Sequence, residues 1–173
     1  DMPPGTGDVQ LTLTQSAPLS GGVIVTTPQD VSVLDAKKGL KMFQKVSVPV
    51  LGIIENMSYF ICDNCDKKHY IFRQGGGQRI STSLGVPFLG EIPLEPEVAI
   101  GGDAGLPIVE KNPATASATA YPRIAGMIAG AHSIPTTLMH VNAAKQTDGQ
   151  KMDKDEAAEA KERADAVVQL LND

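Results

Sequence analysis

Short apolar runs alternate with longer amphipathic segments over about the first 130 residues of the chain. The apolar runs are rich in Val and Ile and punctuated by Gly and Pro, which predicts buried strands at 22–27, 49–54 and 86–92. Helical patterns are expected at 9–15, 30–45, from Gln78 onward, and at 114–131. Strands that are apolar on both faces and alternate with helices are typical of a parallel sheet, so an α/β fold is predicted.

The segment 30–45 is the longest helix expected before the second strand. Asp30 is its expected N-cap, because Asp side chains accept hydrogen bonds from the first N–H groups of a helix. Its apolar positions, which are expected to form an imperfect buried face, are Val31, Leu34, Leu40, Phe43 and Val46.

The last third of the chain has a different pattern. Residues 1–130 are expected to form the folded domain, 131–152 a linker with Pro and Gly, and 153–173 an acidic amphipathic helix with a short heptad-like stripe. The 173 residues carry a formal net charge of −5, and 153–173 hold three basic and seven acidic residues. This balance argues against nucleic acid and anionic membranes as partners, and no apolar run is long enough to span a bilayer.

Ligands of parallel sheets gather in the loops beyond the carboxyl ends of the strands, here 26–29, 55–58 and 93–96. The opening sequence Asp1-Met-Pro-Pro-Gly-Thr-Gly-Asp8 is a loop of the same kind if a strand precedes it, and we expect the chain to be a piece of a longer protein. Its Gly N–H groups could approach a phosphate, and Asp1 could hold Mg²⁺ through water. A solvated Pro/Gly turn is the alternative, because the chain has no Gly-x-x-x-x-Gly-Lys-Ser/Thr sequence.

The two cysteines form a single Cys62-Asp-Asn-Cys65 motif within a polar stretch that predicts a hairpin tip. A four-thiolate site needs two such pairs. The motif is therefore a redox dithiol, a chance pair, or half of a site completed by a second subunit across a two-fold axis. His69 follows four residues later and is expected to stand alone. The run Gly75–Gly77 either positions this loop or is a plain linker.

The segments taken in order closely resemble the Mrp/ApbC iron–sulfur carrier ATPases, which are MinD-like P-loop NTPases. The resemblance covers about residues 1–130 and is carried by Asp1–Asp8, Thr26-Thr-Pro-Gln-Asp30, Glu55-Asn-Met-Ser58, Cys62-x-x-Cys65, Phe72 with Gly75–Gly77, and Gly90-Glu-Ile-Pro-Leu94. It implies a partial parallel-sheet P-loop NTPase with a Cys-x-x-Cys loop, followed here by a helical tail.

The resemblance also implies roles for single residues. Asp1 matches the Walker B acid that supports Mg²⁺, Gly5 would sense the γ-phosphate of ATP, and Asn56 matches the residue that addresses adenine. Cys62 and Cys65 match the pair that holds a [4Fe–4S] cluster across a homodimer, for transfer to apoproteins. The family's Walker A loop has no counterpart in this sequence, so its ATPase activity does not carry over to this polypeptide.

Two other functions stay open from the sequence. One is a zinc-stabilised dimeric binding module without ATPase activity, and the other is a MinD-type partitioning ATPase, against which the acidic terminal segment argues. Free thiols favour a reducing compartment, so a cytoplasmic protein is expected, with the mitochondrial matrix as the alternative.

Overall fold

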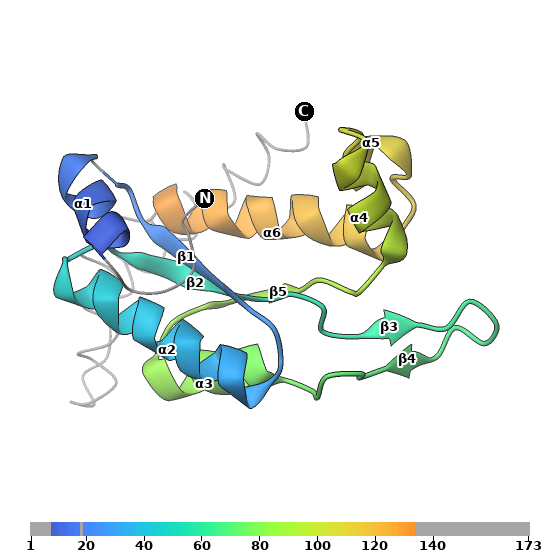
Figure 1. The fold of residues 1–173 in the computed structure, drawn as a ribbon, viewed down its shortest axis with the longest axis horizontal. Coiled ribbons are helices and arrows are strands. Elements are labelled where there is room, and N and C mark those ends of the chain that lie inside the picture. The colour runs from blue at the N-terminus through green and yellow to red at the C-terminus, as the bar shows by residue number, and fades with distance from the viewer. Residues whose placement is uncertain (1–7, 18, 134–173) are drawn as a thin grey trace, which may run out of the picture. The chain divides into compact units, whose positions relative to one another are not determined.

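A computed structural model describes residues 8–17 and 19–133. Its centre is a three-stranded parallel sheet in the order β1-β2-β5, formed by Gly22–Thr26, Val50–Glu55 and Phe88–Glu91 (Figure 1). The three strands that the Val/Ile runs predict are therefore confirmed, and so is their parallel pairing. In register, Thr26 lies beside Glu55, and Glu55 lies beside Glu91, so the three carboxyl ends share one edge of the sheet.

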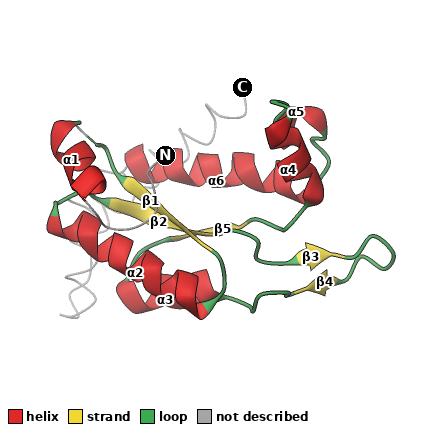
Figure 2. Ribbon diagram, viewed as in Figure 1, coloured by secondary structure: helices red, strands yellow, loops and turns green. Residues whose placement is uncertain are grey.

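Helices cover the sheet on both faces, as Figure 2 shows in red. Helices α2 (Asp30–Lys45) and α3 (Gly76–Leu84) pack with β1 and β2 around a core whose Leu40 and Ile53 are completely buried. Helix α6 (Ala116–Ser133) packs on the other face, where Ala120 and Ile124 meet Leu89. Burial on both faces explains why the strands read as continuous apolar runs.

Helix α2 has the predicted bounds but a different buried face. The predicted face is wrong at its first two members, because Val31 is 74% exposed and Leu34 is 58% exposed. The side chains that are buried instead are Val33, Ala36, Leu40, Met42 and Phe43. The predicted cap is also wrong: Gln29 is the N-cap residue, no side chain caps the helix, and Asp30 is its first residue.

Smaller elements complete the described part of the chain. Helix α1 (Asp8–Ser16) confirms the short helix expected near the start. Helices α4 (Pro96–Asp103) and α5 (Ile108–Lys111), which the sequence did not predict, lie between β5 and α6. No helix among the described residues has the length and apolarity needed to cross a bilayer.

Two strands of two residues each, β3 (Phe60–Ile61) and β4 (Lys68–His69), form a separate antiparallel pair. By its contacts the chain divides into one compact unit at 1–128 and another at 129–173. Of the linker predicted at 131–152, residues 131–133 belong instead to α6, so the prediction is wrong there. The rest of that linker, the predicted acidic helix, and Asp1 and Gly5 of the opening loop lie outside the described residues.

Candidate functional site

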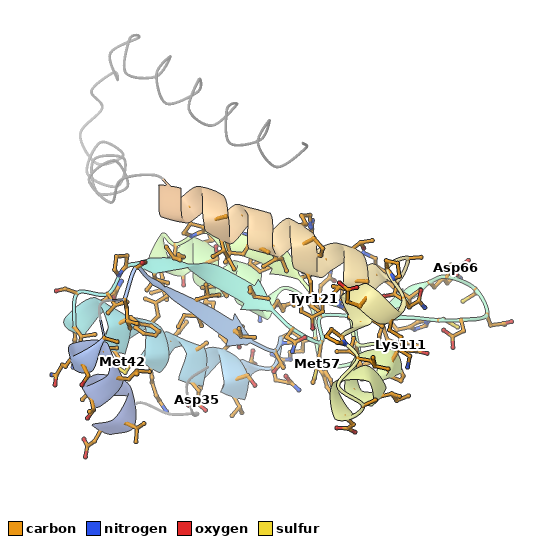
Figure 3. The ribbon with its side chains drawn as sticks, turned by 90° about the horizontal axis from the view of Figure 1, so that it is seen from above. Asp35, Met42, Met57, Asp66, Lys111 and Tyr121 are labelled. Atoms are coloured by element: carbon orange, nitrogen blue, oxygen red, sulfur yellow. The ribbon has the colours of Figure 1, made fainter. Side chains whose placement is uncertain are left out.

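The chain leaves the sheet after Glu55 and returns to it at α3, and we call residues 56–75 between them the cysteine excursion. The β3–β4 hairpin lies within this excursion and projects away from the three-stranded sheet (Figure 1). Figure 3 shows Asp66 at the far end of the hairpin and Met57 where the excursion begins. The cysteine excursion thus places the hairpin that contains Cys62 and Cys65 away from the sheet.

The hairpin turn brings the two thiols together. The N–H of Cys62 donates to the carbonyl of Lys67 at 3.0 Å, and the N–H of Asp66 donates back to the carbonyl of Cys62 at 2.9 Å. Asp66 has a φ of 56°, a left-handed conformation that closes the turn. Neither thiol is in a disulfide; Cys62 is half-buried and Cys65 is exposed. The predicted hairpin tip is therefore confirmed.

His69 joins the thiols, which corrects the expectation that it stands alone. One donor atom from each of Cys62, Cys65 and His69 lies within 4.8 Å of the other two. The reason is register: His69 pairs with Phe60, and Cys62 follows two residues after Phe60 on the same face. Strands of two residues are too short to give a period-2 signal, so the sequence alone could not find this arrangement.

The opposite face of the hairpin is aromatic. Tyr59 and Tyr70 meet edge to face, with ring centroids 6.3 Å apart, and the Lys68 ammonium lies 4.0 Å from the centroid of Tyr59. Contacts of this kind stabilise a small hairpin that has little buried surface of its own. The hairpin therefore presents sulfur and imidazole on the face that also holds Phe60, and the two tyrosines on the other.

The turn favours the thiolate form of Cys62. The backbone N–H of Asn64 is the main cause that lowers the pKa of Cys62, followed by hydrogen bonds from the Cys65 side chain and from its backbone N–H. Partial burial and the nearby charge of Asp63 oppose this by raising the pKa. Thiolates, rather than thiols, are the metal-binding and nucleophilic form of cysteine.

Glu55 anchors both ends of the cysteine excursion to the sheet. Its side chain is completely buried and accepts hydrogen bonds from the Ser58 hydroxyl and from the N–H of Gly77, each at 2.6 Å. Ser58, also fully buried, donates its own N–H to the carbonyl of Ile92 at 3.0 Å. Sequence reasoning missed this role, although a Glu that ends a Val/Ile strand is the signal that could have indicated it.

The glycine run Gly75–Gly77 lies where the cysteine excursion ends and α3 begins. A side chain at Gly76 would place its Cβ 2.6 Å from the carbonyl oxygen of Pro28, so only glycine allows α3 to begin so close to the loop after β1. Gly75 precedes α3 with a φ of 68°. Arg73 and Arg79 both form exposed ion pairs with Asp30 at the start of α2. The run therefore positions the return of the excursion, rather than linking it loosely.

Asn56 lies at the carboxyl end of β2. Its N–H donates to the Thr26 carbonyl at 2.7 Å, and its Oδ1 accepts from the N–H of Met57 at 2.9 Å. Among the described residues, no group accepts a hydrogen bond from the side-chain amide of Asn56. Of the three residues that the resemblance assigns to the nucleotide and its Mg²⁺, Asn56 is the one that the structure describes, and a single amide does not make a nucleotide site.

Comparisons with known proteins agree with this architecture. Residues 1–129 match the family model described as ParA, NUBPL iron-transfer P-loop NTPase. The chain is 60% identical over 131 residues to the "Iron-sulfur cluster carrier protein" of Synechocystis, covering 75% of this chain and 37% of that protein. It is 47% identical over 128 residues to the mouse "Iron-sulfur cluster transfer protein NUBPL", covering 74% of this chain and 40% of that one. The chain thus spans well under half the length of these relatives.

Solved structures give the same fold. A nucleotide-binding protein from Archaeoglobus fulgidus, described in complex with ADP and with cobalt, is 38% identical with a TM-score of 0.54, covering 60% of this chain and 43% of that one. The MinD cell division protein of Aquifex aeolicus matches with a TM-score of 0.53 at 22% identity, covering 74% of this chain and 50% of that one, and supports the fold alone. By its sequence match and its fold, the chain belongs to the ParA family of NUBPL iron-transfer P-loop NTPases.

Proposed function

We propose that this chain is the part of an iron–sulfur cluster carrier that binds the cluster, and that Cys62 and Cys65 are its cluster ligands. The observation that carries the proposal is the hairpin tip, where two free thiols lie together at the end of a projecting excursion. Hydrogen bonds that favour the thiolate of Cys62 suit it to bind iron. The names of the relatives as cluster carrier and transfer proteins support the same function.

The number of thiols implies two chains per cluster. A [4Fe–4S] cluster takes four thiolates, and each chain has two cysteines. A homodimer related by a two-fold axis supplies the other pair, because the same surface of each subunit then meets its own copy. A cluster held at the tips of two hairpins lies near solvent, where an apoprotein recipient can reach it.

Nucleotide binding would belong to a full-length protein of the size of the relatives, of which this chain covers well under half. We assign Asp1 to Mg²⁺, Gly5 to the γ-phosphate and Asn56 to the adenine edge, on the resemblance and on the Archaeoglobus relative described with ADP. ATP binding and hydrolysis need a phosphate-binding Lys loop, which this sequence does not contain. We place the protein in a reducing compartment, the cytoplasm or the mitochondrial matrix, where the thiols stay free.

Anaerobic reconstitution with iron and sulfide tests the cargo site. The wild-type chain should bind about two iron atoms per chain and sediment as a dimer, since four thiolates hold one cluster. The Cys62→Ser, Cys65→Ser variant should lose this iron, while Asn64→Ser, which changes one of the two residues between the thiols and keeps both thiols, should retain it. A double variant with unchanged iron content would contradict the proposal.

A further inference from the structure

We propose that Cys62, Cys65 and His69 of a single chain form a binding site for one divalent transition-metal ion of the zinc class, with a fourth coordination position left open. This inference goes beyond the proposed cluster function, with which it shares the two thiols. It predicts one metal ion per chain without dimerisation, whereas a bridging site predicts half a metal centre per chain.

The geometry of the hairpin carries the first step. The two sulfurs and one imidazole nitrogen lie within 4.8 Å of one another. Around a tetrahedral Zn²⁺, with bonds of about 2.3 Å to sulfur and about 2.0 Å to nitrogen, such donors are separated by roughly 3.5–3.8 Å. Closing the remaining distance, at most about 1 Å, takes small rotations of the exposed Cys65 and His69 side chains.

The backbone fixes the three ligands before the metal arrives. The β3–β4 ladder pairs Phe60 with His69 and so fixes the position of His69. The backbone hydrogen bonds of Cys62 with Lys67 and Asp66 hold Cys62 at the turn, on the face of the hairpin that carries His69. The N–H of Cys65 donates to the Cys62 carbonyl at 3.3 Å and so keeps Cys65 close to it. A metal ion that enters such a site does not have to order the chain, so less of its binding free energy is lost.

The donor set selects the class of metal. Two thiolates and one imidazole suit Zn²⁺, Co²⁺ and Fe²⁺ better than Mg²⁺ or Ca²⁺, which prefer oxygen. Two thiolates also neutralise the charge of a divalent ion. No fourth Cys, His, Asp or Glu joins the group among the described residues, so the fourth position is open to water or to an incoming ligand.

The same two sulfurs cannot serve both a metal ion in one chain and a bridging cluster. Four thiolates complete the cluster, so His69 has no role in holding it, whereas His69 is a full ligand of the single ion. Metal of the zinc class therefore competes with cluster loading, and His69 determines how well it competes.

Cobalt binding under anaerobic conditions tests the site in the full 173-residue chain. We expect about one Co²⁺ per chain in a monomer, with charge-transfer absorption from two thiolates and d–d bands of a tetrahedral ion. His69→Gln should weaken binding by at least about tenfold, because even loss of a second-shell partner costs that much. His69→Cys should restore binding, and Tyr70→Phe, a neighbour on the aromatic face, should leave it unchanged.

Three results would overturn the inference. They are unchanged cobalt affinity and spectrum in His69→Gln, a dimer with four thiolates around one cobalt in the wild type, and a His69→Cys variant that keeps its circular dichroism but binds no cobalt. X-ray absorption at the zinc edge provides a second readout, since a histidine ligand adds imidazole scattering that four thiolates lack.

Reconstitution with iron and sulfide separates this inference from the proposed function. His69→Gln should still load a cluster to the wild-type level, and Zn²⁺ should slow loading in the wild type more than in the variant. If neither the wild type nor His69→Gln loads a cluster but the cobalt results hold, the cluster proposal fails and the single-ion site stands. If zinc slows both proteins equally, His69 is not a ligand and the inference fails.

Discussion

The sheet core and the cysteine hairpin are built in opposite ways. In the core, side chains such as Leu40 and Ile53 are completely buried between the sheet and its helices. In the hairpin, every residue from Asp63 to Tyr70 is exposed, and each strand has two residues. Burial in the core therefore stabilises the fold, whereas the hairpin carries the candidate metal ligands. Glu55 connects the two regions through its hydrogen bonds to Ser58 and Gly77.

A matched pair of isoleucines should give the largest contrast between these regions. Ile53→Ala in β2 should lower the free energy of unfolding by about 3–5 kcal/mol, because it leaves a cavity in a filled core. Ile71→Ala in the cysteine excursion, where the side chain is 57% exposed, should change it by less than about 0.5 kcal/mol. Urea unfolding followed by circular dichroism measures both, and equal losses would remove the contrast.

Glu55 should give the next largest effect, since it belongs to both regions. Glu55→Ala leaves the Ser58 hydroxyl and the Gly77 N–H without their buried acceptor, so we expect a loss of about 2–3 kcal/mol. Hydrogen exchange should rise over residues 56–75 more than over β1. The control is Glu110→Ala, an exposed Glu that should have little effect. Unchanged exchange in the excursion would show that Glu55 does not anchor it.

The ion pairs at Asp30 should contribute less. Asp30→Asn removes the partner of Arg73 and Arg79, but all three side chains are more than half exposed, so the loss should stay below about 1 kcal/mol and shrink in high salt. Asp35→Asn, which breaks the exposed pair with Lys38, is the matched control. A loss of several kcal/mol would mean that these pairs, rather than Glu55, secure the excursion.

The thiolate preference of Cys62 should change reactivity without a measurable change in stability. Because its pKa is lowered, the pH midpoint of Cys62 alkylation should lie below the midpoint of the same residue in the urea-unfolded chain. Asp63→Asn should move the midpoint lower still, since the negative charge of Asp63 opposes the thiolate. Peptide mapping by mass spectrometry after timed alkylation gives both values. A midpoint that rises in Asp63→Asn would contradict this account of the turn.

The strands and most helices could be predicted from the sequence, because long apolar runs and helical periods are local signals. The face of α2 could not, since Val31 and Val33 are equally apolar and only contact with β1 and β2 decides which is buried. The pair Cys62 and Cys65 was visible as a motif. His69 and Glu55 were not, because their partners are set by strand register and by the return of the chain at Gly77.

The edge-to-face tyrosines give the hairpin an optical reporter of its own. The chain has no Trp and three Tyr, of which Tyr59 and Tyr70 are on the hairpin and Tyr121 is in α6. Ultraviolet emission from the unlabelled protein therefore comes largely from the element that carries the thiols. Loading and release of a coloured metal centre can be followed there in real time, and a Tyr121→Phe variant removes the remaining background.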